Sequence, residues 1–141
     1  MMESYRVVSQ LNEQQISDLV ELYKNEFWSD KRTRPEVDKM LAASDIIIGL
    51  VDECDRLVAF TRVLTDFVYR AIIFDVIVKP DYRDQGLGKQ LLDSVVNHPQ
   101  LQSVEYLGLY CLPEMVKFYE RWGFTTEIGG FQLMLRSSRN Q

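Results

Sequence analysis

The stretch "KPDYRDQGLGKQLL", residues 79–92, joins an apolar run to an amphipathic one through a glycine-rich turn. Its glycines, Gly86 and Gly88, stand between two cations, Arg83 and Lys89. Glycine adopts backbone conformations that a side chain would oppose, and a helix that begins here has N–H groups without a partner inside the helix. Such N–H groups attract an anion, and the helix dipole adds about half a positive charge. The stretch therefore predicts a strand, a turn that can hold an anion, and a helix.

Two familiar phosphate-binding turns do not match this stretch. A dinucleotide fingerprint needs a third glycine where Leu91 stands, and a P-loop needs glycine and Ser or Thr where Arg83 and Gln90 stand. Lys89 favours a bound anion, because a cation in the first helical turn is otherwise unfavourable. A second interpretation stays open on spacing alone: the glycines relieve backbone strain, and the two cations are simply solvated.

Composition and charge restrict the class of protein. A chain of 141 residues with 46% hydrophobic residues predicts one domain over residues 1–141. The net charge of −5 argues against a nucleic-acid partner and suits a cationic small molecule. The N-terminus lacks a signal pattern and no apolar run approaches a membrane span, so we expect a cytoplasmic protein with no membrane partner. Two cysteines, Cys54 and Cys111, and one histidine, His98, predict neither a disulfide framework nor a metal site.

Hydrophobic periodicity predicts an α/β domain with a mixed sheet. The run over 71–78 is apolar except for Asp75, which predicts a strand buried on both faces between layers of helices. Asn12 is a plausible helix N-cap, and Gly123 stands where a left-handed helix end is needed. The expected strands cover residues 5–9, 45–53, 56–67, 69–80, 103–111 and 131–136, and the expected helices cover 12–28, 35–41, 86–97 and 114–122.

Two motifs in this order resemble the GNAT superfamily of N-acetyltransferases. V-x-V-x-P-x-Y-R-x-x-G-x-G covers residues 76–88, and F-Y-E-x-x-G-F covers residues 118–124. The resemblance extends over most of the chain and implies the GNAT fold, a central mixed, mostly antiparallel sheet flanked by helices. It implies that acetyl-CoA binds along the strand that ends at Val78, with its diphosphate on the turn. The implied cofactor residues are Val76, Ile77, Val78, Arg83, Asp84, Gln85, Gly86, Leu87, Gly88, Lys89 and Phe118.

The resemblance also implies catalytic roles. Tyr119 matches the tyrosine that donates a proton to the leaving thiolate, and the N–H near Val76 would stabilise the oxyanion. Asp75, the one charge in an apolar strand, is our candidate for relaying a proton from the amine through water, although a structural role is an equal alternative. The chain departs from the family at Leu112, where many relatives carry asparagine, and at Asp84, where glycine is common.

The acceptor is the least defined part of this interpretation. Trp28, Asp30, Phe67 and Tyr69 are candidate substrate-binding residues, because aromatic rings beside acids suit a primary amine on an apolar body. Core packing is the alternative for these aromatic residues. We expect a small-molecule amine acetyltransferase without a metal, and a homodimer is possible by resemblance. The alternatives are a lysine or N-terminal acetyltransferase of proteins or peptides, and a CoA-binding sensor without turnover.

Overall fold

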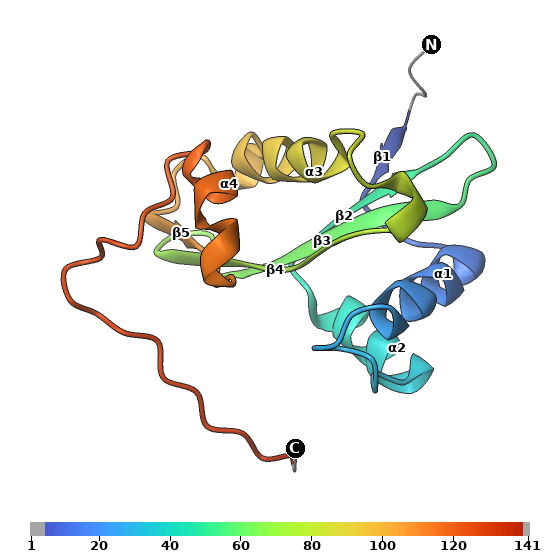
Figure 1. Cartoon of the computed structure of the whole chain (residues 1–141), viewed down its shortest axis with the longest axis horizontal. Helices are drawn as coiled ribbons and strands as arrows, with labels where there is room; N and C mark the ends of the chain where they lie inside the picture. The colour runs from blue at the N-terminus through green and yellow to red at the C-terminus, as the bar shows by residue number, and fades with distance from the viewer. Residues whose placement is uncertain (1–4, 140–141) are drawn as a thin grey trace. The chain divides into compact units, whose positions relative to one another are not determined.

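A five-stranded sheet with the order β1-β2-β3-β4-β5 organises the first part of the chain (Figure 1). The computed structural model describes residues 5–139 in two units, the first ending at Leu109 and the second beginning at Tyr110. Strands β1 to β4 are antiparallel to their neighbours, and β5 is parallel to β4. The predicted mixed, mostly antiparallel sheet is confirmed, whereas the single domain stays a prediction. The strands are β1 (Arg6–Val8), β2 (Ile46–Val51), β3 (Leu57–Thr65), β4 (Arg70–Val78) and β5 (Tyr106–Gly108).

Helices cover both faces of this sheet, as the sequence predicts. Helix α3 (Leu87–Val96) packs on β2, β3 and β4, and α1 (Glu13–Lys24) packs on β3 and on α2 (Arg34–Ala43). Figure 1 shows α3 along one face and the pair α1 and α2 along the other. Short 3-10 turns at Pro80–Tyr82 and Pro99–Leu101 lie on either side of α3 in the sequence.

The first two helices begin at reciprocal caps. The side chain of Asn12 accepts the N–H of Gln15, and the side chain of Gln15 accepts the N–H of Asn12. Thr33 and Glu36 form the same arrangement at α2. Both caps satisfy N–H groups that the helix itself leaves unpaired. The cap predicted at Asn12 is confirmed.

Strand β4 is less buried than its apolar sequence predicts. Ala71, Ile73 and Ile77 are buried, but the residues between them are partly exposed. The reason is that β5 pairs with residues 70–72, and no other strand of the described residues lies beside the rest of β4 on this side. Strand β3 carries more of the core, with Leu57, Val58, Ala59, Phe60, Thr61 and Val63 buried.

A β-bulge interrupts the pairing of β3 and β4 at Asp75. Phe60 pairs with Ile77 and Arg62 with Phe74, so that one residue of β3 opposes two of β4. Asp75 takes the left-handed conformation, with φ of 59°. An extra residue of this kind bends a strand and increases its twist.

Three donors hold the Asp75 carboxylate at this bulge. Its Oδ2 accepts the hydroxyl of Tyr23 at 2.9 Å, Nη1 of Arg32 at 3.0 Å and Nε of Arg62 at 2.7 Å. The Asp75 side chain is 5% exposed. Burial and the neighbouring carboxylate raise the pKa of the Tyr23 phenol. These four residues, which we call the Asp75 cluster, fasten α1 and the segment after it to β4.

The second unit begins with a 3-10 turn at Pro113–Met115 and continues into α4 (Val116–Glu120). Helix α4 is shorter than predicted because the chain begins as this tighter turn. Gly123 follows with φ of 89°, which confirms the predicted left-handed helix end.

The strand predicted over 131–136 is wrong for the described residues. No strand forms there, and the side chains of Phe131, Leu133, Met134 and Leu135 are exposed. An alternating apolar sequence becomes a strand only where a partner pairs with its backbone, and none of the described residues does so here.

We predict that Asp75→Asn lowers the free energy of unfolding by about 2–4 kcal/mol, because it leaves two guanidinium groups without their carboxylate. Asparagine tolerates a left-handed φ, so the backbone is not the cause. Asp55→Asn is the matched control, since Asp55 has φ of 65° and an exposed ion pair with Arg6. Asp55→Asn should lower the free energy of unfolding by less than about 1 kcal/mol. Urea titration measures this free energy for both variants. Equal losses in the two variants would contradict the importance of the cluster.

Candidate functional site

The edge of β4 that faces β5 is open beyond Ile72. The pairing of β4 and β5 ends at Ile72 and Gly108, so no strand among the described residues of the first unit lies beside residues 73–78 on this side. A Cβ on Gly108 would lie 3.3 Å from the Ile72 side chain. Glycine therefore permits close packing at the last paired position before the edge opens.

The open edge presents backbone amides. The N–H of Lys79 donates to the carbonyl of Val58 in β3 at 2.8 Å. Because hydrogen-bonding direction alternates along an antiparallel pair, Ile77 also faces β3, while Val76 and Val78 face away from it. Two N–H groups two residues apart are thus available to an extended ligand that carries amides of its own.

The glycine-rich turn leads from this edge to the beginning of α3. Among the described residues, none caps helix α3 with a side chain at Gly86, and its first turn carries no acidic residue. Gly86 has φ of 82°, and an added Cβ would meet nothing within 4 Å, so glycine is required for conformation rather than space. The N–H groups of Leu87, Gly88 and Lys89 begin the helix without a capping side chain, an arrangement suited to an anion.

Asp84 also has a left-handed φ, 65°. This conformation explains why glycine would be favoured at the position, and aspartate is among the side chains that tolerate it. The exposed carboxylate nevertheless adds a negative charge to a turn whose amides favour anions.

The two cations of the turn already have protein partners. Arg83 pairs through Nη2 with Oε1 of Glu26 at 2.9 Å and donates through Nε to the carbonyl of Val78 at 3.2 Å. Lys89 pairs with Asp93, one helical turn later, at 2.6 Å. Lys89 is therefore not in itself a sign of a bound anion. Glu26 lies 57 residues from Arg83 in the sequence, so only the structure reveals this pair.

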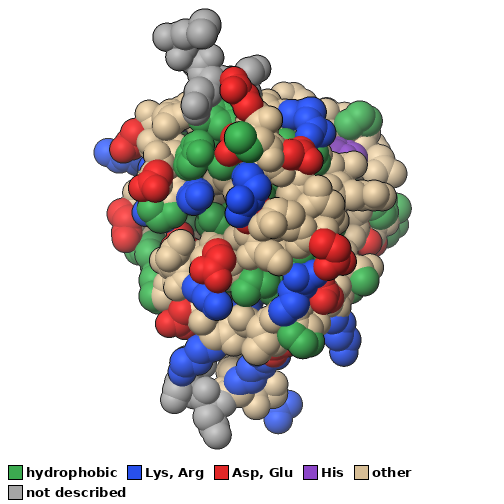
Figure 2. Space-filling model, turned by 90° about the vertical axis from the view of Figure 1, so that its right-hand side faces the viewer, with side chains coloured by type: hydrophobic (Ala, Val, Ile, Leu, Met, Phe, Trp, Pro, Cys, Tyr) green, Lys and Arg blue, Asp and Glu red, His purple; other side chains and the backbone are tan. Residues whose placement is uncertain are grey.

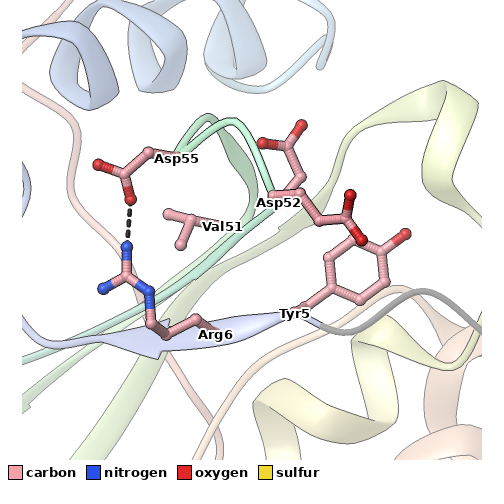
Figure 3. Close-up of a pocket in the computed structure, with 6 residues that line it drawn as sticks. Tyr5, Arg6, Val51, Asp52 and Asp55 are labelled. Carbon is pink, nitrogen blue, oxygen red and sulfur yellow. Dashed lines mark hydrogen bonds and ion pairs between the residues drawn. The ribbon is translucent and has the colours of Figure 1, made fainter.

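A hollow of about 460 Å³ lies at β1 and the β2–β3 connection (Figure 3). Tyr5 lines it and donates its hydroxyl to Oε1 of Gln85 at 2.8 Å. Figure 3 also shows the ion pair of Arg6 and Asp55. Three of the six residues that line the hollow are acidic, so the hollow does not suit a diphosphate. Its lining residues are Tyr5, Arg6, Val51, Asp52, Glu53 and Asp55.

The predicted substrate residues fall into two groups. Trp28 follows α1, is 43% exposed and contacts the ring of Tyr23 at 6.3 Å between centroids. The guanidinium of Arg32 lies 4.5 Å from the Tyr23 ring and 5.5 Å from the Trp28 ring. Asp30 is exposed in the same segment. This group therefore adjoins the Asp75 cluster.

Phe67 and Tyr69 form the second group, in the β3–β4 turn. Oδ1 of Asp66 accepts the N–H groups of Val68, Tyr69 and Arg70. These backbone bonds lower the pKa of Asp66. Its carboxylate thus maintains the turn instead of facing a ligand. Among the described residues, no hydrogen bond or ring contact joins the two groups.

Tyr119 belongs to the second unit and is 8% exposed in α4. Burial, and secondarily Cys111, raises the pKa of its phenol to about 12, so that the hydroxyl keeps its proton at neutral pH. The ring of Phe118 contacts those of Tyr119 and Trp122, each at 5.1 Å. Phe118 thus packs within an aromatic group of its own unit.

Charges of both signs mix on the face drawn in Figure 2, where basic side chains do not gather in one area. Among residues 5–139, none of the helices combines the length and apolar character that a membrane crossing requires. Within the same residues, no three His, Cys, Asp or Glu side chains gather as metal ligands.

Comparison with known proteins identifies the family. Residues 43–126 match the family described as acetyltransferase (GNAT) domain. An uncharacterized N-acetyltransferase, ycf52, of Porphyra purpurea is 32% identical over 107 residues, which are 74% of this chain and 62% of the relative. A chloroplastic GCN5-related N-acetyltransferase of Arabidopsis thaliana is 30% identical over 114 residues, 79% of this chain and 58% of the relative. The chain thus spans about three fifths of the length of these curated relatives.

A solved structure extends this likeness to the fold. A Xanthomonas campestris pv. campestris protein assigned to the GNAT family superimposes with a TM-score of 0.84 at 29% identity, over 97% of this chain and 95% of that chain. The resemblance carried by the two sequence motifs is therefore confirmed. The chain belongs to the GNAT family of acetyltransferases.

Proposed function

We propose that this protein transfers the acetyl group of acetyl-CoA to the primary amine of a small molecule. The observation that carries the proposal is the continuity of the open β4 edge with the uncapped beginning of α3. Val76 and Val78 offer N–H groups to the amides of a pantetheine arm, and the turn before α3 offers N–H groups to a diphosphate. One extended ligand that carries both chemical groups can use both features.

Backbone groups make most of the proposed cofactor site. The N–H groups at Gln85, Gly86, Leu87, Gly88 and Lys89 bind the diphosphate, while Arg83 exchanges Glu26 for a phosphate oxygen. The N–H of Val76 then stabilises the oxyanion that forms during attack. The thioester of acetyl-CoA supplies the activated acetyl group.

The proposed reaction is a direct attack. An alkyl amine has a pKa of about 10, so it must lose a proton before its nitrogen attacks the thioester carbon. The new C–N bond creates the oxyanion, which collapses as the C–S bond breaks. The departing thiolate takes the phenolic proton of Tyr119, and a proton from solvent restores the phenol. Asp75 relays the amine proton through water. The three donors of the Asp75 cluster all bind Oδ2, so none of them occupies Oδ1.

A thiol-release assay with acetyl-CoA and an amine panel tests this reaction. Tyr119→Phe should lower kcat by about 100-fold or more, because the thiolate loses its proton donor. Tyr106→Phe removes an exposed hydroxyl from β5 and should leave kcat unchanged. Unchanged turnover in Tyr119→Phe would contradict the role of Tyr119 as the general acid. No turnover with any amine would favour a CoA-binding sensor, and turnover with peptides alone would favour a protein acceptor.

The raised pKa of Tyr119 predicts the shape of the pH profile. The rate should rise from pH 7 to pH 10 as the amine loses its proton. Tyr119 should add no descending limb in this range, because its pKa is raised to about 12. A descending limb near pH 10 that disappears in Tyr119→Phe would show that the phenol ionises at its ordinary pKa.

Glu26→Gln should tighten CoA binding about twofold to fivefold, because the substitution frees Arg83 and removes a negative charge near the diphosphate. Glu21→Gln is the control on α1, where Glu21 pairs only with Lys24 among the described residues. Isothermal titration calorimetry measures both dissociation constants. Weaker binding in Glu26→Gln would mean that Glu26 positions Arg83 for the ligand instead of competing with it.

The cytoplasmic location and the homodimer stay predictions. Size-exclusion chromatography with light scattering of the purified chain reports the oligomeric state directly.

A further inference from the structure

The Asp75 cluster contains one more positive than negative charge. Asp75 is its single carboxylate, while Arg32 and Arg62 each contribute a guanidinium group. The side chains of Arg32 and Arg62 are 31% and 12% exposed, respectively. A partly buried charge without a counterion is unfavourable, so this group favours an additional anion.

Both guanidinium groups have donors that Asp75 does not use. Arg32 donates to Asp75 through Nη1 alone, and Arg62 through Nε alone, although a guanidinium carries five N–H groups. Among the described residues, no fully buried side-chain nitrogen lacks a hydrogen-bond partner. The donors that the protein leaves unused therefore reach the surface. Guanidinium groups of this kind bind carboxylate and phosphate oxygens well.

The same structure limits recognition of a cation at the predicted substrate residues. Asp66 is committed to the backbone of the β3–β4 turn, and Glu26 is paired with Arg83. Asp30 is the acid among the predicted substrate residues, and its exposure lets water screen its charge. The arginines of the Asp75 cluster are more buried and are held in place by Asp75.

The cluster also lies beside the proposed transfer site. Asp75 immediately precedes Val76, whose N–H we assign to the open edge of β4 from the alternation along the strand. The Trp28 ring, 5.5 Å from the Arg32 guanidinium, adds an apolar wall that is 43% exposed. An acceptor that reaches the thioester from this face would place its body against these groups.

We propose that Arg32 and Arg62 bind an oxyanion of the acceptor, so that the preferred acceptor is a small amine whose body carries a carboxylate or a phosphate. This inference rests on the proposed acetyl transfer, and it names the acceptor class for that reaction. Asp75 acts here as a positioning residue that holds both guanidinium groups.

The test compares matched amines that differ in the anion. Tyrosine is paired with tyramine, and phosphoethanolamine with ethanolamine, in the thiol-release assay with acetyl-CoA. The wild type should favour the anionic member of at least one pair by about tenfold or more in kcat/KM. The pair that shows the preference assigns carboxylate or phosphate.

Arg32→Gln should reduce this preference at least severalfold, because it removes one of the two guanidinium groups that bind the oxyanion. The preference is the ratio of two kcat/KM values measured on the same variant. A loss of folded protein lowers both values equally and leaves the ratio unchanged. Arg34→Gln is the matched control, because Arg34 lies two residues away and pairs with Glu13 and Asp38. A preference that persists in Arg32→Gln, or a wild type that favours the neutral amines, would overturn the inference.

Calorimetry with tyrosine and phosphoethanolamine, in the presence of CoA, separates this inference from the proposed transfer. Binding that needs Arg32, without turnover of any amine, would support the anion site and overturn the transfer. Turnover of the amines without a preference for the anionic members would support the transfer and overturn the anion site. Neither binding nor preference in the wild type would overturn the anion site.

Discussion

The ion-paired carboxylate of Asp75 is the interaction on which the candidate site depends. It lies at a bulge of β4, where it takes a left-handed backbone conformation and binds Tyr23, Arg32 and Arg62. Its partners come from α1, from the segment after α1 and from β3, so one side chain connects three parts of the first unit. The bulge bends β4, and the pairing of β4 with β5 ends before it. The strand edge that can bind an extended ligand therefore begins where the Asp75 cluster holds the strand.

The other half of the proposed cofactor site is made of backbone rather than side chains. The turn before α3 combines a glycine at positive φ with a helix that has no side-chain cap. Its cations are engaged elsewhere in this structure, Arg83 with Glu26 and Lys89 with Asp93. A diphosphate would thus bind amides that are already oriented and would compete for Arg83. This competition connects the turn to the segment after α1, because Glu26 belongs to that segment.

The Asp75 cluster has a different electrostatic character from the whole chain. The net charge of −5 suggests cationic partners, yet the Asp75 cluster, which adjoins the open edge of β4, contains two arginines and one aspartate. Local charge in a partly buried site outweighs the average over an exposed surface, because water and salt screen exposed charges more effectively. An amine with an anionic body reconciles the proposed chemistry with this local excess of positive charge.

Local rules in the sequence determined the caps at Asn12 and Gly123, the turn at Gly86 and the succession of helices and strands up to β5, because each depends on residues a few positions apart. The two motifs were enough to indicate the family. Only the tertiary structure decided the partners of Asp75, which lie 13 to 52 residues away, and the pairing of Arg83 with Glu26. It also showed that Asp66 maintains a turn and that residues 131–136 form no strand. Pairing between distant segments depends on how the sheet and helices pack, which periodicity and spacing along the chain do not specify.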